Sequence, residues 1–280
     1  MPVMKNINFM GQSRQLKQYG MKKSIFILIG LIGWMAFSFT TNTAFAQAER
    51  FSKNRFAGDK GDTLNYRLLV PDYAKGRKYP LVVFLHGSGE RGSDNEAQLK
   101  WGVLNFATDE AMSQRPAIVI APQCPEKMSW DNSSFNQATR EMQMKDTPSK
   151  TMGLLIALIN DLVKKMPVDP GRIYITGLSM GGFGTFDAIE RYPELFAAAV
   201  PVCGGGDLSK AGTISKLPLW IFHGAEDDAV NPEFSLKMVR ALTDAGGHPG
   251  FTLYPEVGHF SWLAAYSDPL MMEWLFRQRR

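Results

Sequence analysis

Apolar residues gather in this chain in two kinds of segment. Short runs such as 81–85 and 117–121 are apolar at nearly every position, which is typical of parallel strands covered on both faces. Longer segments such as 152–165 place apolar residues three and four apart and predict amphipathic helices. From residue 47 onward the two kinds alternate without internal repeats. This order predicts an α/β fold of three layers, with a mostly parallel central sheet between helices.

The remaining predicted elements continue the alternation. Further strands are expected at 64–70, 172–176, 197–202, 217–222 and 251–254, and further helices at 182–192, 231–245 and 269–277. The interval 122–150 is long, polar and contains aromatic residues. Connections of that length in a compact domain are unusual unless they are functional.

One strand and the helix after it are joined by Gly177-Leu178-Ser179-Met180-Gly181. A G-x-S-x-G sequence between a buried strand and a helix predicts a nucleophile elbow, a turn so tight that the serine adopts a strained backbone conformation. Glycine at 177 and 181 would let strand and helix approach closely. We therefore predict that Ser179 is a nucleophile.

A serine hydroxyl needs a base, and the base in turn needs an acid that orients it. Of the four histidines, only His259 follows the last predicted strand, where the chain order serine, acid, histidine places the base. Glu226, Asp227 and Asp228 all follow the strand at 217–222. We choose Asp227 as the acid, with Asp228 as the main rival.

The negative charge of a tetrahedral intermediate requires hydrogen-bond donors. We expect these from the backbone N–H groups of Met180, directly after the nucleophile, and of Ser88, in the loop after the strand at 81–85. His86 and His223 each end a predicted strand before a glycine. We expect both histidines to be structural, with hydrogen bonds to loop backbone.

The first 46 residues predict a signal peptide rather than part of the fold. A basic stretch, Met21-Lys22-Lys23, precedes an apolar run at 25–39, and Ala44-Phe45-Ala46 provides an A-x-A cleavage site before Gln47. The core of the signal spans 21–46, and 47–280 forms a single domain. An uncleaved anchor is the alternative, although the apolar run is short for a span. We expect a periplasmic or secreted protein that does not insert stably into the membrane once the signal is removed.

Removal of the signal changes the charge and redox arguments. All five basic residues of the first 46 positions would leave, and the formal net charge of +4 would become −1. The basic character is therefore no indication of nucleic-acid binding. Export also permits a disulfide between Cys124 and Cys203. Their strands should lie three ladder steps apart, about 14 Å at ~4.8 Å per step, so two buried free thiols are favoured.

Several motifs together resemble the α/β-hydrolase superfamily. They are residues 86–92 (HGSGERG), 122–125 (PQCP), 168–174 (VDPGRIY), 177–182 (GLSMGG), 223–227 (HGAED) and 258–262 (GHFSW). Within the superfamily the chain is similar to exported bacterial esterases grouped with phospholipase/carboxylesterase, dienelactone-hydrolase-like and feruloyl or acetylxylan esterase proteins. Such proteins often carry a prolyl-oligopeptidase-type label. The resemblance implies Asp227 as the acid. The short interval 204–216 leaves no room for a large cap domain.

The substrate-facing residues are less clearly indicated. Trp130, in the long interval, and Trp262, after His259, could form an aromatic wall for a sugar or a phenolic acyl group, or could pack in the core. Phe260 replaces a residue that is often polar in relatives. No metal-ligand spacing or phosphate-cradling loop is present, so neither a metal nor a cofactor is expected.

These features predict a serine carboxylesterase that forms an acyl-enzyme, with acyl or feruloyl esters of polysaccharides as substrates and small or polyester-type esters as the next candidates. A serine peptidase of the prolyl-oligopeptidase type is the first alternative. A non-catalytic binding protein of the same fold is the second, and the intact Ser179, Asp227 and His259 count against it.

Overall fold

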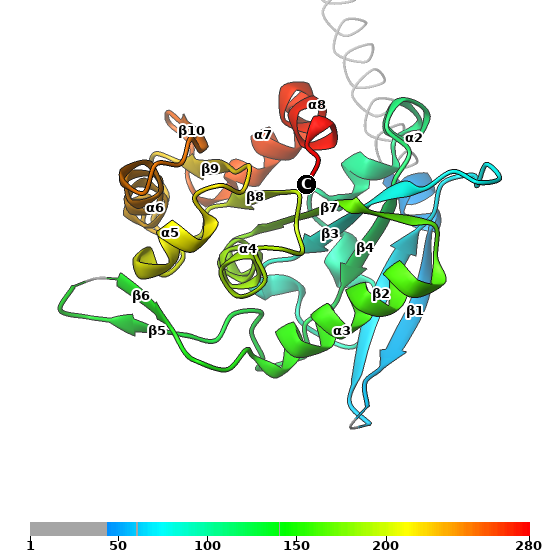
Figure 1. The fold of residues 1–280 in the computed structure, drawn as a ribbon, viewed down its shortest axis with the longest axis horizontal. Helices are drawn as coiled ribbons and strands as arrows, with labels where there is room; N and C mark the ends of the chain where they lie inside the picture. Colours follow the sequence, from blue (N-terminus) through cyan, green and yellow to red (C-terminus); the bar gives the residue numbers. More distant parts are fainter. Residues whose placement is uncertain (1–43, 60, 140) are drawn as a thin grey trace, which may run out of the picture. The chain divides into compact units, whose positions relative to one another are not determined.

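The computed structural model describes residues 44–59, 61–139 and 141–280. An eight-stranded sheet runs through residues 47–280 in the order β1-β2-β4-β3-β7-β8-β9-β10 (Figure 1). The bounds of these strands are β1 Phe51–Ala57, β2 Thr63–Leu69, β3 Tyr79–Leu85, β4 Ile118–Pro122, β7 Val168–Leu178, β8 Ala198–Val202, β9 Trp220–Gly224 and β10 Gly250–Tyr254. β1, β2 and β4 pair antiparallel, and every pair from β4 to β10 is parallel. The predicted mostly parallel sheet is confirmed.

Helices cover both faces of the sheet and make the outer two layers. They are α2 Asp109–Gln114, α3 Lys150–Lys165, α4 Met180–Arg191, α5 Ala211–Ile214, α6 Glu233–Asp244, α7 Trp262–Ser267 and α8 Pro269–Arg277. Figure 1 shows α3 and α4 on one side of the sheet and α7 and α8 on the other. Two apolar clusters fill the spaces between the layers, one beneath α3, α4 and α6 and one beneath α7 and α8.

The strongest apolar patterns gave the most accurate predictions. Every residue of β3 and β4 is buried, as expected for strands covered on both faces. Ser149 caps α3 by accepting a hydrogen bond from the Met152 N–H at 3.0 Å, and two lysines occupy the last turn. The helix expected at 269–277 is found at those residues.

Three groups of elements escaped the sequence prediction. β1 is an edge strand whose side chains mostly face solvent, so its apolar signal is weak. Within 122–150 the chain forms a hairpin of β5 Ser133–Asn136 and β6 Glu141–Met144, which carries almost no buried side chains. The short helices α2 and α7 also lacked a detectable period. β1 and the hairpin are marked by few buried apolar residues, and α2 and α7, with six residues each, are too short to show a helical period.

The two cysteines lie as predicted. Cys124 follows β4 and Cys203 follows β8, three positions apart in the sheet, and both are buried free thiols. The predicted signal peptide falls almost entirely on residues outside the described ranges, so it stays a prediction. Among the described residues, no helix combines the length and hydrophobicity needed to cross a bilayer.

Candidate active site

Ser179 lies between β7 and α4 in the conformation expected of a nucleophile elbow. Its φ of 53° and ψ of −116° lie in a backbone region that residues other than glycine rarely adopt. The Ser179 N–H is held by the Val202 carbonyl of β8 at 3.0 Å. A Cβ on Gly177 or Gly181 would collide with neighbouring backbone, because strand and helix approach so closely here. The two glycines are therefore required by packing, as predicted.

The side chains of Ser179, His259 and Asp227 form a continuous hydrogen-bonded chain. Ser179 Oγ lies 3.0 Å from His259 Nε2, and His259 Nδ1 lies 2.8 Å from Asp227 Oδ2. They come from three separate positions in the sheet: the ends of β7, β9 and β10. His259 is 20% exposed, whereas the Asp227 side chain is fully buried. This is the geometry that acid–base activation of a serine requires.

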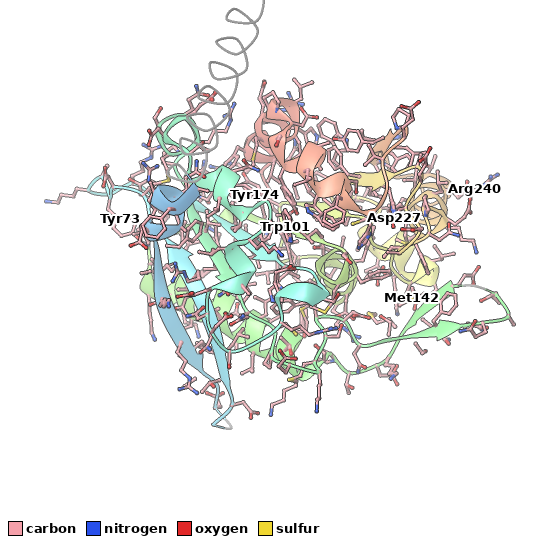
Figure 2. All side chains as sticks on the ribbon, turned by 180° about the vertical axis from the view of Figure 1, so that it is seen from behind. Tyr73, Trp101, Met142, Tyr174, Asp227 and Arg240 are labelled. Atoms are coloured by element: carbon pink, nitrogen blue, oxygen red, sulfur yellow. The ribbon has the colours of Figure 1, made fainter. Side chains whose placement is uncertain are left out.

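The surroundings of Asp227 explain why it, rather than Asp228, lies beside His259. Its Oδ1 accepts the N–H groups of Ala229 and Val230 at 3.0 and 2.8 Å, which fixes the carboxylate while leaving Oδ2 toward His259. Asp228 is exposed on the same loop. Figure 2 labels Asp227, which lies on the loop after β9.

His86 and His223 are scaffold residues, as the sequence suggested. His86 Nε2 accepts the Cys124 N–H at 2.9 Å, so its Nδ1 donates to the Gly87 carbonyl at 2.6 Å. Burial lowers the pKa of His86 to about 4. His223 Nε2 lies 2.9 Å from the Val230 carbonyl, and burial also lowers its pKa. Both rings therefore hold loops together, and His86 does so as a neutral group.

The two expected oxyanion donors lie at the starts of helical turns. Met180 is the first residue of α4, and Ser88 is the first residue of a 3₁₀ turn that spans Ser88–Glu90. The N–H groups in the first turn of a helix have no acceptor within the helix. Both groups therefore remain available for a developing oxyanion, and their role stays a prediction.

The expectation that Trp130 contacts substrate does not fit its burial. Trp130 is 0% exposed, and its indole N–H donates to the His86 carbonyl at 3.1 Å. The tryptophan therefore braces the oxyanion loop from within the core, because a buried indole needs an acceptor and finds it there. Trp262 is also buried, but its ring packs edge-on against the His259 imidazole, with centroids 5.0 Å apart. It supports the histidine from behind.

Two aromatic residues near His259 were not chosen from the sequence as substrate contacts. Phe260 is 54% exposed, and its ring contacts Trp262 and Trp101 at centroid distances of 4.8 and 5.8 Å. Trp101, labelled in Figure 2, also lies close enough to Glu90 of the oxyanion loop to lower the pKa of that carboxyl, against the larger effect of burial, which raises it. Trp101, Phe260 and Trp262 thus form an aromatic wall between the oxyanion loop and the histidine loop. In the sequence, Phe260 was singled out only because relatives often carry a polar residue at that position. Trp101 lay in an interval without a predicted element.

One group of side chains among the described residues has the composition of a metal site. Ligand atoms of Cys203, Asp227 and His259 lie within 4.8 Å of one another. Two of the three already belong to the hydrogen-bonded chain, and burial raises the pKa of the Cys203 thiol to about 12. A thiol in that state is a poor metal ligand. The donor set therefore suits proton transfer better than metal binding.

Solved structures with a similar fold include several esterases. A thermostable esterase matches with a TM-score of 0.78 at 40% identity, over 84% of this chain and 64% of that one. A ferulic acid esterase matches with a TM-score of 0.61 at 17% identity, over 81% of this chain and 96% of the other, which shows the fold alone.

Relatives of known sequence point to the same chemistry. Poly(3-hydroxyalkanoate) depolymerase C of Paucimonas lemoignei is 28% identical over 60% of this chain and 45% of its own length. A probable carboxylesterase of Oryza sativa subsp. japonica is 26% identical over 65% of this chain and 81% of its own length. This chain spans less than half of the length of the first relatives it matches. The sequence profile of the phospholipase/carboxylesterase family matches residues 72–268, and the chain belongs to that family.

Proposed function

We propose that this α/β-hydrolase is a serine carboxylesterase that forms an acyl-enzyme. The observation that carries the proposal is the chain from Ser179 Oγ through His259 to Asp227, with links of 3.0 and 2.8 Å. Family membership supports an esterase, and the hydrogen-bonded chain supplies its mechanism.

Each group has a defined step in this mechanism. Ser179 Oγ attacks the ester carbonyl while His259 Nε2 takes its proton. Asp227 stays ionised, accepts a hydrogen bond from the Nδ1–H of His259 and stabilises the imidazolium. The N–H groups of Ser88 and Met180 stabilise the oxyanion, and each such donor contributes roughly 3–4 kcal/mol. His259 then protonates the leaving alcohol, and water, activated by the same histidine, releases the acid.

We further propose that the substrates are acyl or feruloyl esters of polysaccharides, and that the protein acts after export. In the aromatic wall, Trp101 and the exposed Phe260 pack on the buried Trp262 and offer an apolar surface beside His259, suited to a phenolic ring or a sugar face. Among the relatives is a bifunctional acetylxylan esterase/xylanase of Neocallimastix patriciarum, 26% identical over 54% of this chain.

Hydrolysis of p-nitrophenyl acetate, methyl ferulate and a peptide p-nitroanilide by residues 47–280 tests the proposal. We expect turnover of both esters, with little cleavage of the anilide. Peptide cleavage faster than ester cleavage would instead support a serine peptidase, an activity found among more distant relatives. A folded protein that turned over none of the three would contradict both proposals and favour a binding protein.

A further inference from the structure

A second set of aromatic rings leads away from the nucleophile on the side of the sheet covered by α4 and α6. Phe183 lies one turn into α4, where its N–H donates to the Ser179 carbonyl at 3.1 Å. Its ring contacts Phe234 of α6 at a centroid distance of 5.6 Å, and Phe234 contacts Phe135 of the β5–β6 hairpin at 5.8 Å. This aromatic row therefore connects the helix that follows the nucleophile with the hairpin.

A cavity of about 330 Å³ lies at the outer end of the aromatic row. It is lined by Phe135, Asn231, Glu233, Phe234 and Lys237. Its volume is at the small end of the range for ligand pockets, about 300–1,000 Å³, so it suits one ring rather than a polymer segment. Phe135 is 40% exposed, so the cavity is accessible from solvent.

The hairpin that forms one wall of the cavity is fixed at its base. The Asn132 N–H donates to Asp187 Oδ2 at 3.2 Å, and Asp187 forms a buried ion pair with Arg191 at 2.9 Å. Arg191 also donates to the Lys145 carbonyl at 2.8 Å. The Met144 N–H donates to Asp207 Oδ2 at 2.9 Å. These contacts tie both strands of the hairpin to α4 and to the loop after β8.

The other side of the cavity is held by α6. Lys237 Nζ donates to the Thr139 carbonyl in the hairpin turn at 3.3 Å and lies 3.7 Å from Glu141. Figure 2 shows Met142 of the hairpin and Arg240 of α6 on the same side of the molecule. The cavity is therefore preformed, as is usual for a ligand site.

The composition of the lining distinguishes between possible ligands. A sugar ring has polarised C–H faces that pack on the negative faces of aromatic rings, and a rim of hydroxyls that both donate and accept hydrogen bonds. Glu233 offers an acceptor and Lys237 a donor. Asn231 uses its Oδ1 for the Glu233 N–H at 2.9 Å, so its NH₂ group can donate. A phenolic acyl group has few oxygens and would use fewer of these hydrogen-bonding groups than a sugar ring would.

We propose that this cavity is a glycosyl subsite, which binds one sugar ring of the polysaccharide at a distance from the ester bond. This inference rests on the proposed function for the identity of the substrate. The ester lies at Ser179, and the aromatic row spans the distance to the bound sugar.

The binding of an unesterified probe tests the subsite independently of catalysis. Isothermal titration calorimetry with xylotetraose should show binding to the wild type and about tenfold weaker binding to Phe135→Ala. Tyr73→Ala is the matched control, because Tyr73 is 49% exposed and lies at the far side of the molecule in Figure 2. The control should bind like the wild type. Absence of binding to the wild type, or equal binding by Phe135→Ala, would overturn the subsite.

A pair of esters with the same acyl group links the subsite to turnover. Phe135→Ala should lower kcat/KM about tenfold for a feruloylated arabinoxylotriose and leave kcat/KM for methyl ferulate unchanged. An equal fall for both esters would assign Phe135 to the acyl group and overturn the glycosyl subsite. If the wild type hydrolyses neither ester, the proposed function fails, while the xylotetraose titration still decides the subsite.

Discussion

His259, on the loop after β10, and His223, at the end of β9, both lie close to Asp227 Oδ2, yet the two histidines differ in their other contacts and in their exposure. His259 Nδ1 lies 2.8 Å from Asp227 Oδ2, and His223 Nε2 lies 3.3 Å from it. The second nitrogen of His259 faces Ser179 Oγ, whereas His223 Nδ1 faces Ser235 Oγ at 2.7 Å in the core. Of the two histidines, only His259 has a second nitrogen that reaches Ser179 Oγ, and for this reason we propose His259 as the base.

Exposure separates the two residues further. The His223 side chain is 0% exposed, and Ser235, its partner, donates in turn to the Gly204 carbonyl at 3.0 Å. His223 therefore joins β9, α6 and the loop after β8. His259 is part-exposed and can exchange protons with substrate and water. The comparison predicts that removal of one histidine affects activity and that removal of the other affects stability.

The largest expected effect follows from His259→Ala. We expect kcat/KM for p-nitrophenyl acetate to fall roughly 10⁵-fold, since the serine loses its base. The free energy of unfolding should change by less than about 1 kcal/mol, because the side chain is partly exposed. His248→Ala, on an exposed turn, is the control. A variant that keeps more than a tenth of the activity would remove His259 from the mechanism.

Asp227→Asn should have the next largest effect. An amide at this position favours the wrong tautomer of His259, and the corresponding change in a Ser-His-Asp protease lowers kcat about 10⁴-fold. Asp228→Asn should leave kcat/KM within about threefold of the wild type, because Asp228 is exposed. Steady-state assays of the two variants side by side decide between these residues. A larger loss in Asp228→Asn would reverse the assignment.

His86 differs from both histidines in that none of its hydrogen bonds is to a carboxylate. We expect its titration to contribute to the pH dependence of the free energy of unfolding. Its pKa is about 4 in the folded protein, against about 6.5 when unfolded. Between these values the unfolded chain binds more protons, so this stabilisation is complete above pH 6.5 and lost as the pH falls toward 4. The loss amounts to about 3 kcal/mol.

Urea unfolding at pH 7 and pH 4 measures that contribution. The free energy of unfolding of the wild type should fall by about 3 kcal/mol more than that of His86→Gln over this interval. Equal falls in the two proteins would show that His86 titrates normally in the folded state.

The smallest expected effect belongs to His223→Ala. The change leaves the Val230 carbonyl without the His223 ring and removes one of the two hydrogen bonds of the Ser235 hydroxyl, so we expect a loss of about 2 kcal/mol in the free energy of unfolding. The kcat/KM of the folded variant should stay within about tenfold of the wild type, because the two N–H bonds to Asp227 Oδ1 remain. Full stability combined with a loss of activity as large as that of His259→Ala would contradict the comparison.

The sequence was sufficient to predict that Ser179, His259 and Asp227 come together, because each is tied to a strong local pattern. Ser179 stands in a strand–turn–helix motif that few other sequences satisfy, and His259 and Asp227 follow from chain order. The central strands are apolar at every position, which makes them easy to recognise. Where backbone geometry requires a particular residue type, that position can be recognised from the sequence.

The surfaces that would contact substrate could not be predicted in the same way. Trp130 and Trp101 are both tryptophans in intervals outside the predicted elements, and nothing in their neighbours shows that one is buried and the other joins the wall beside His259. Phe135 and Phe234 are about 100 residues apart and meet only because a hairpin folds back toward α6. Contacts of this kind depend on tertiary packing rather than on local periodicity.

The most direct test of the central claim is a rapid-quench reaction of residues 47–280 with p-nitrophenyl acetate, followed by intact-protein and peptide mass spectrometry. The account predicts a burst of p-nitrophenol stoichiometric with enzyme and an acetyl group on the peptide that contains Ser179. Ser179→Ala should show neither. Steady turnover without a burst is also expected if deacylation is rapid, so the site of acetylation and the Ser179→Ala variant decide the question. Acetylation at another residue, or full activity in Ser179→Ala, would contradict a serine acyl-enzyme.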